Sequence, residues 1–99
     1  MRIDVSGKHL DVTSAIEEYA DTKCSKLPRY YNGVQSVEVI LEQPRHEQFE
    51  VELRVDVEKH DTFVSHADGQ DLYKCIDSSV DKMVRQLTDF KERLKNSKR

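Results

Sequence analysis

FEVELRVDV, residues 49–57, is the stretch that decides the fold of this 99-residue chain. Apolar and charged side chains alternate along it without exception, from Phe49 to Val57. Because neighbouring side chains of a β-strand point to opposite faces of a sheet, this period of two predicts a strand with one buried and one solvated face. The sheet that contains it therefore needs a cover on one side only.

Three other stretches alternate in the same way and complete a predicted four-stranded sheet. They are residues 2–6, closed by Gly7; residues 36–42, which follow Asn32-Gly33 and end near Pro44; and residues 62–67, which follow a turn at His60-Asp61. In the last of these strands the inward positions hold Phe63, Ser65 and Ala67, so we expect this inner row to be small.

A first helix is predicted between the first two strands. We expect it to begin at Thr13 or Ser14, because Ser14 and Glu17 have the spacing of a capping box. Apolar residues then recur at steps of three and four. The regular helix should end near Pro28, which cannot donate the next backbone hydrogen bond.

A second, longer helix is predicted after the last strand. Asp68 is the expected cap, and Asp71 near the first turn complements the positive end of the helix dipole. The segment that follows contains neither proline nor glycine. Its apolar stripe consists of Leu72, Ile76, Val80, Met83, Leu87, Phe90 and Leu94.

These elements give the order β-α-β-β-β-α and an α+β fold. A right-handed crossover makes the first two strands parallel, and the remaining strands follow as an antiparallel meander. The result is a four-stranded mixed sheet with both helices packed on one face. We expect one domain spanning residues 1–99, with a basic C-terminus that frays from about residue 95.

The composition indicates a cytoplasmic protein without a membrane role. No apolar run approaches the roughly 20 residues that span a bilayer, and the N-terminus enters a strand pattern with no signal peptide in view. Cys24 and Cys75 are expected to be buried free thiols, since disulfides are typical of oxidising compartments; a disulfide is the weaker interpretation.

The net charge of −3 is unevenly distributed. From Lys74 to the end, eight basic and four acidic residues give +4, which leaves −7 on the preceding residues. The outward positions of the predicted sheet are mostly carboxylates, which argues against RNA binding through bases stacked on that face. The last helix is therefore the expected contact with an anionic partner.

On a helical wheel the basic residues Lys74, Lys82, Arg85 and Arg93 lie away from the apolar stripe, and the last three share a flank that Asp89 interrupts. A planar guanidinium can bind phosphate through two hydrogen bonds, so Arg85 is the residue that we most expect to contact phosphate. Residues that extend this surface are Lys8, His9, Lys23, Lys26 and Arg29. A solvated helix face is the more common meaning of such mixed charges and stays open as the alternative.

Neither a metal site nor an enzyme is predicted. The histidines are His9, His46, His60 and His66, and none has a partner at metal-ligand spacing. The sequence also lacks a glycine-rich phosphate loop and a nucleophile elbow, so we expect no cofactor and no small-molecule substrate. A hydrolase built on the carboxylate rows is a third, less favoured hypothesis.

Several motifs resemble one bacterial family along the whole chain. They are Ser6-Gly7-Lys8-His9, Val12-Thr13, Glu18-Tyr19, Lys26-Leu27, residues 69–73 (GQDLY), Ile76-Asp77, Asp81-Lys82 and Arg85-Gln86-Leu87. Together they resemble the short form of the ribosome hibernation-promoting factor family, which includes the ribosome-associated inhibitor and is also labelled sigma-54 modulation protein.

The resemblance implies a fold similar to double-stranded RNA-binding domains and a site on 16S rRNA of the small ribosomal subunit, in the channel that mRNA and tRNA occupy. Its implied action is to occlude that channel. Positions where the family tends to place basic residues hold Lys23, Lys26, Lys82, Arg85, Lys91 and Lys95, and Gln86 lies within a matched motif. This chain departs from the family at Asp89, where a lysine is common, and at Pro28 and Cys24.

Two further expectations follow from the resemblance. Long family members carry a C-terminal dimerisation domain that has no counterpart here, so pairing of ribosomes would require a separate factor. The sigma-54 label also leaves open an alternative function, a protein-binding regulator of transcription that acts through the acidic sheet face or an exposed sheet edge.

Overall fold

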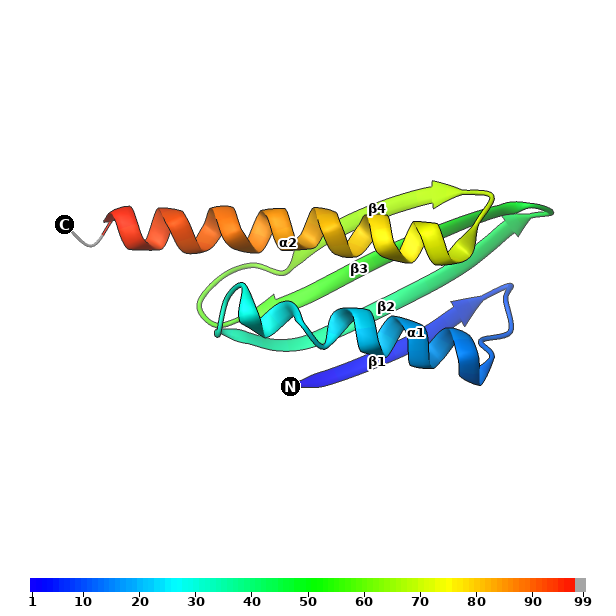
Figure 1. Ribbon diagram of the computed structural model, residues 1–99, viewed down its shortest axis with the longest axis horizontal. Helices are drawn as coiled ribbons and strands as arrows, with labels where there is room; N and C mark the ends of the chain where they lie inside the picture. Colours follow the sequence, from blue (N-terminus) through cyan, green and yellow to red (C-terminus); the bar gives the residue numbers. More distant parts are fainter. Residues whose placement is uncertain (98–99) are drawn as a thin grey trace.

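The four predicted strands form one mixed sheet in the computed structural model, which describes residues 1–97. They are β1 (Arg2–Lys8), β2 (Val34–Arg45), β3 (Gln48–Val57) and β4 (Phe63–Gly69), and they lie side by side in sequence order. β1 runs parallel to β2, with Val5 opposite Val39, whereas the other two pairs are antiparallel. This topology confirms the prediction (Figure 1).

Both helices cover the same face of the sheet, as predicted (Figure 1). The first, α1 (Ser14–Cys24), packs on β1, and the second, α2 (Leu72–Ser97), packs on β3 and β4. A short 3-10 turn, η1 (Leu27–Arg29), follows α1. The opposite face of the sheet is left without a helix, as the charged rows of the strands require.

The core lies between the sheet and the helices and is built from the inward rows of the strands. Leu53 in the central strand β3 is fully buried, and so are Leu41 on β2 and Leu87 on α2. The small inner row predicted for β4 is confirmed. Its Ser65 hydroxyl donates a hydrogen bond of 2.8 Å to the backbone carbonyl of Ser79, so the small side chains let α2 lie close to β4.

The start of α2 differs from the prediction. The expected cap, Asp68, lies inside β4, because this strand continues two residues further than expected, to Gly69. The cap is Asp71, whose Oδ1 accepts hydrogen bonds from the backbone N–H groups of Tyr73 (3.0 Å) and Lys74 (3.3 Å). Asp71 therefore satisfies two of the backbone donors that a helix start leaves unpaired.

This difference gives a prediction about stability. We expect Asp71→Ala to lower the free energy of unfolding by about 1 kcal/mol, because it removes the cap. Asp68→Ala should change that free energy by less than about 0.5 kcal/mol, as expected for an exposed position without such a bond. Urea denaturation followed by circular dichroism measures both variants. A larger loss for Asp68→Ala would contradict the assignment of the cap.

Other element ends also depart from the sequence-based expectations. Of the two expected caps of α1, Thr13 is confirmed, because its Oγ1 accepts a hydrogen bond from the Ile16 N–H; the capping box of Ser14 with Glu17 is wrong, because Ser14 is already the first residue of the helix. The α-helix ends at Cys24, before Pro28, which instead occupies the first turn of η1, where its missing N–H is tolerated. β2 continues through Pro44, at a point where the pairing with β3 is irregular.

β1 extends past Gly7 to Lys8. A Cβ atom at Gly7 would collide with the backbone carbonyl of Leu10, so the close turn after β1 requires glycine at this position. α2 is helical to Ser97, and residues 98 and 99 lie outside the described residues, so the fraying expected from about residue 95 stays a prediction. Beyond the sheet the end of α2 projects on its own (Figure 1).

Cys24 and Cys75 are buried free cysteines, as predicted. Burial raises the pKa of the Cys24 thiol to about 12 and also raises that of Cys75, so both thiols stay protonated near neutral pH. Among residues 1–97, no helix combines the length and the apolar character needed to cross a bilayer.

Candidate nucleic-acid interface

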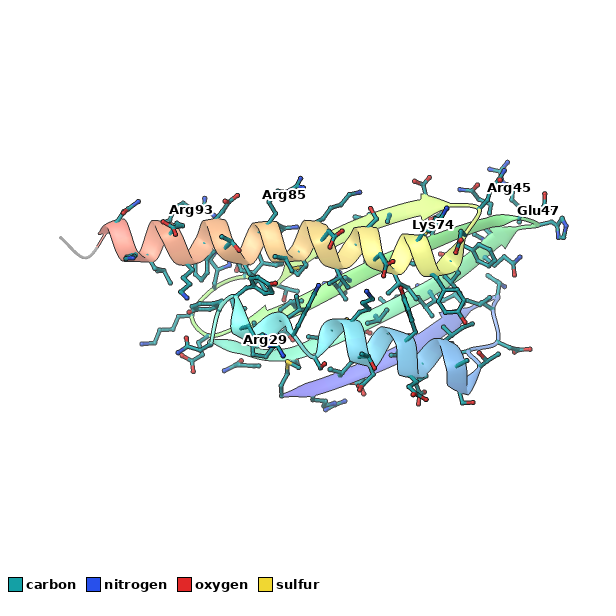
Figure 2. All side chains as sticks on the ribbon, viewed as in Figure 1. Arg29, Arg45, Glu47, Lys74, Arg85 and Arg93 are labelled. Carbon is teal, nitrogen blue, oxygen red and sulfur yellow. The ribbon has the colours of Figure 1, made fainter. Side chains whose placement is uncertain are left out.

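Three cations on α2 form what we call the outer row, namely Lys82, Arg85 and Arg93. All three are exposed. Figure 2 shows Arg85 and Arg93 on the side of α2 remote from α1. Their spacing of three and eight residues places them on one flank of a helix, as the sequence predicted. The outer row therefore presents its charges to solvent along one line.

Two side chains of α2 beside or within the outer row form hydrogen bonds to β4. The Lys82 Nζ donates to the backbone carbonyl of His66 (2.6 Å), and the Gln86 Nε2 donates to that of Val64 (2.8 Å). β4 is an edge strand, so these bonds use carbonyls on its unpaired side. The Gln86 amide nitrogen is thus engaged within the fold, whereas the Lys82 ammonium has three N–H donors and keeps two for another acceptor.

The outer row is not neutralised by ion pairs inside the described part of the chain. No carboxylate of residues 1–97 lies within 4.0 Å of the charged nitrogens of Lys82, Arg85 or Arg93. Asp89 is four residues from Arg85 and from Arg93 and reduces the local charge without pairing. Asp81 and Glu92 are also exposed on this flank, so the outer row offers an anionic partner three cations that are free of ion pairs within residues 1–97, without an excess of positive charge on the flank as a whole.

A second group of predicted residues lies toward the gap between the helices. Lys23 on α1 is 3.5 Å from Oδ1 of Asp77 on α2, and the same oxygen accepts a hydrogen bond of 2.7 Å from the Tyr19 hydroxyl. The Lys23 ammonium also lies over the Tyr19 ring, 5.4 Å from its centroid. Lys23 thus helps to join α1 to α2, and its charge is partly offset by Asp77.

The bond to Asp77 also affects the tyrosine. The hydrogen bond raises the pKa of Tyr19 to about 12, with contributions from burial and from the negative charge of Asp77. The phenol therefore remains a donor throughout the neutral range, and the connection between the helices stays intact there. Sequence reasoning missed Asp77, because a contact between two helices leaves no spacing signal along the chain.

Four predicted cations lie near this second group or beyond it. Lys91 and Lys95 follow Asp77 at helical spacings that keep them on the α1-facing flank of α2, and both are exposed. Lys26 is half-buried and precedes η1 as its N-cap residue. Lys74 is exposed near the start of α2 (Figure 2). The helix layer therefore carries most of the predicted site.

The structure does not bring His9 and Arg29 to the outer row, and Lys8 approaches it only at Lys82. Lys8 belongs to β1 and lines a shallow hollow of the uncovered sheet face that it shares with Lys82, Glu42 and Glu50. His9 follows in the turn, with a φ of 55°. Figure 2 shows Arg29 at η1, on the side of the helix layer opposite Arg85. The twelve predicted residues therefore do not form one patch.

The uncovered sheet face is acidic, as the sequence predicted. Arg54 is its main basic side chain and is engaged with Glu52 (3.1 Å) and Glu38 (4.0 Å). Hydrogen bonds from Thr62 and Ser36 lower the pKa of Asp56, so this carboxylate keeps its charge. Within residues 1–97 no group of three or more possible ligands could hold a metal ion. Phosphate would be repelled from this face.

Comparison with known proteins gives consistent matches. The family model described as sigma 54 modulation protein / S30EA ribosomal protein matches residues 3–95. A ribosome hibernation promoting factor of Azotobacter vinelandii is 36% identical over 93 residues, which cover 94% of this chain and 85% of that protein. Its counterpart in Escherichia coli K12 is 33% identical over 98 residues, covering 96% and 98%.

Two solved structures share the fold. The N-terminal domain of Protein Y from Thermus thermophilus superposes with a TM-score of 0.76 at 27% identity, covering 90% of this chain and 94% of that one. A ribosomal subunit interface protein from Coxiella burnetii superposes with a TM-score of 0.80 at 23% identity, covering 93% and 99%. Both superpositions agree with the strand and helix order described above.

Proposed function

The chain belongs to the sigma 54 modulation protein / S30EA ribosomal protein family, and from this membership we propose that it associates with ribosomes and holds them out of translation. Relatives at 33% to 36% identity are named ribosome hibernation promoting factors. The proposed contact is rRNA of the small subunit, in the channel used by mRNA and tRNA. The protein acts there by occupying space, without making or breaking bonds.

The outer row is the observation that carries this proposal. Three exposed cations lie on one flank with no carboxylate of residues 1–97 within ion-pair distance, so they can meet phosphates without first breaking an internal ion pair, and Lys82 can do so with the two N–H donors that its bond to His66 leaves free. The acidic sheet face lies on the side of the sheet away from the helices, and of the outer row only Lys82 reaches it. A protein with a net charge of −3 can therefore bind a polyanion in one orientation.

Two features of the structure support the geometry of binding. The hydrogen bonds from Lys82 and Gln86 to β4 fix the rotation of α2, so the outer row has a defined direction. The contact of Tyr19 and Lys23 with Asp77 fixes α1 against α2. A preformed array loses little conformational entropy when it meets phosphates, which favours recognition of shape over sequence.

Co-sedimentation with ribosomes tests the proposal. If the three outer-row cations each neutralise one phosphate, affinity should fall about 20- to 40-fold between 50 and 200 mM salt. Binding that is absent, or that does not respond to salt, would contradict it. Recovery of a transcription factor without ribosomal components in a pull-down would favour the alternative regulator instead.

A further inference from the structure

The two edges of the sheet are protected differently. At the β4 edge, side chains of α2 bond to the outward carbonyls of Val64 and His66. At the β1 edge, residues 1–97 provide no side chain that bonds to the outward backbone groups. The side-chain hydrogen bond of β1 runs within the strand, from Arg2 to Asp4 (2.9 Å). In a parallel edge strand, half of the backbone N–H and C=O groups point away from the neighbour. The β1 edge is thus open to another strand.

A groove runs beside this open edge, between β1 and α1. We call it the β1 groove, and its lining residues are Ile3, Asp4, Val5, Ser14, Glu17, Glu18 and Asp21. Ile3 and Val5 are only half-buried, so they give the groove an apolar floor. The wall is the flank of α1 that faces away from α2, and it carries three exposed carboxylates. Among residues 1–97, no basic side chain lines the groove.

We propose that the β1 groove binds an extended, lysine- and arginine-rich segment of another protein, which adds a strand to β1. Backbone hydrogen bonds to the open edge would supply affinity that does not depend on side chains. The aliphatic stems of lysine or arginine would cover Ile3 and Val5, while their charged ends reach Glu18 and Asp21. Asp4 is held by Arg2 and contributes less.

The negative charge of the β1 groove favours a basic strand over two other partners, a second copy of this chain and nucleic acid. A second copy of the chain, paired edge to edge, would bring the carboxylates of two α1 flanks together, and like charges at a strand pair are unfavourable. Nucleic acid would be repelled by the same carboxylates. The β1 groove lies at the sheet edge opposite the outer row, so both surfaces can be occupied at once, and this inference does not rest on the proposed function.

A synthetic peptide of alternating lysine and valine, seven residues long like β1, tests the inference. The wild-type protein should bind it and show slowed amide hydrogen exchange along β1 in NMR spectra. The comparison peptide has proline in place of valine, which keeps the charge but removes backbone donors. It should bind at least about fivefold more weakly, because strand addition needs those donors.

Two charge variants locate the contact. Glu18→Lys with Asp21→Lys should raise the Kd for the lysine-valine peptide about tenfold. The control, Glu42→Lys with Glu50→Lys on the uncovered sheet face, makes the same change in net charge and should raise it less than about twofold. All four residues are exposed or partly exposed.

Three outcomes would overturn the inference: equal binding of the proline peptide, equal effects of the two charge variants, or unchanged amide hydrogen exchange in β1. Ribosome co-sedimentation of Glu18→Lys with Asp21→Lys should stay unchanged, which separates this site from the outer row.

Discussion

Replacing Arg85 and Arg93 together with glutamate is expected to weaken binding to ribosomes about 100-fold in low-salt buffer. Each change removes a cation that no carboxylate of residues 1–97 pairs, and it places a negative charge where phosphate should lie. The slope of log affinity against log salt should become shallower by about 2, because two phosphate contacts are lost. Co-sedimentation across a salt series measures both quantities.

Lys82 is left unchanged in this variant because its ammonium also bonds to β4. Replacing it would change both the stability of the fold and the affinity for ribosomes, and the two effects could not be separated. The matched control is Arg2→Glu with Arg45→Glu, which changes net charge equally at exposed sites off the helices; Figure 2 shows Arg45 at the β2–β3 hairpin. Its affinity should fall less than about threefold. Asp89→Lys should act in the opposite direction and strengthen binding. Equal losses for both double variants would remove the outer row from the interface.

The repeating parts of the sequence predicted most of the fold. Strict alternation from Phe49 to Val57 located β3 and its buried face, and the stripe from Leu72 onward located α2. These patterns predict the elements reliably because the buried side chains recur once per turn in a helix and at every second residue in a strand, so many residues carry the same signal. Ends of elements depend instead on single local bonds. The sequence indicated Asp68 as the cap and placed Asp71 in the first turn, but β4 continues to Gly69 and so moves the cap to Asp71.

The candidate site was predicted less completely, for a physical reason. A helical wheel shows which residues share a flank of α2, and it grouped Lys82, Arg85 and Arg93 as the structure does. It does not show which of them are already engaged across the fold. The bonds of Lys23 to Asp77, and of Gln86 to β4, join residues far apart in sequence, so they became visible only in three dimensions.

Replacing Leu87 with alanine is expected to lower the free energy of unfolding by about 3 to 5 kcal/mol. Leu87 is fully buried between α2 and the sheet, so the change both loses transfer free energy and leaves a cavity. For a chain of this length that is a large part of the total stability. Urea denaturation at 25 °C, with the slope of the transition compared between variants, gives the difference.

The same helix offers a control with the same chemistry. Leu94 lies one heptad after Leu87 and belongs to the same stripe in the sequence, so periodicity alone predicts equal burial and equal loss. In the structure Leu94 is 37% exposed, because α2 has passed the end of the sheet (Figure 1). Leu94→Ala should therefore cost less than about 1 kcal/mol. Similar losses for the two variants would mean that the end of α2 is covered in solution, either by this chain or by a second copy, and concentration dependence of the Leu94→Ala transition would distinguish these two arrangements.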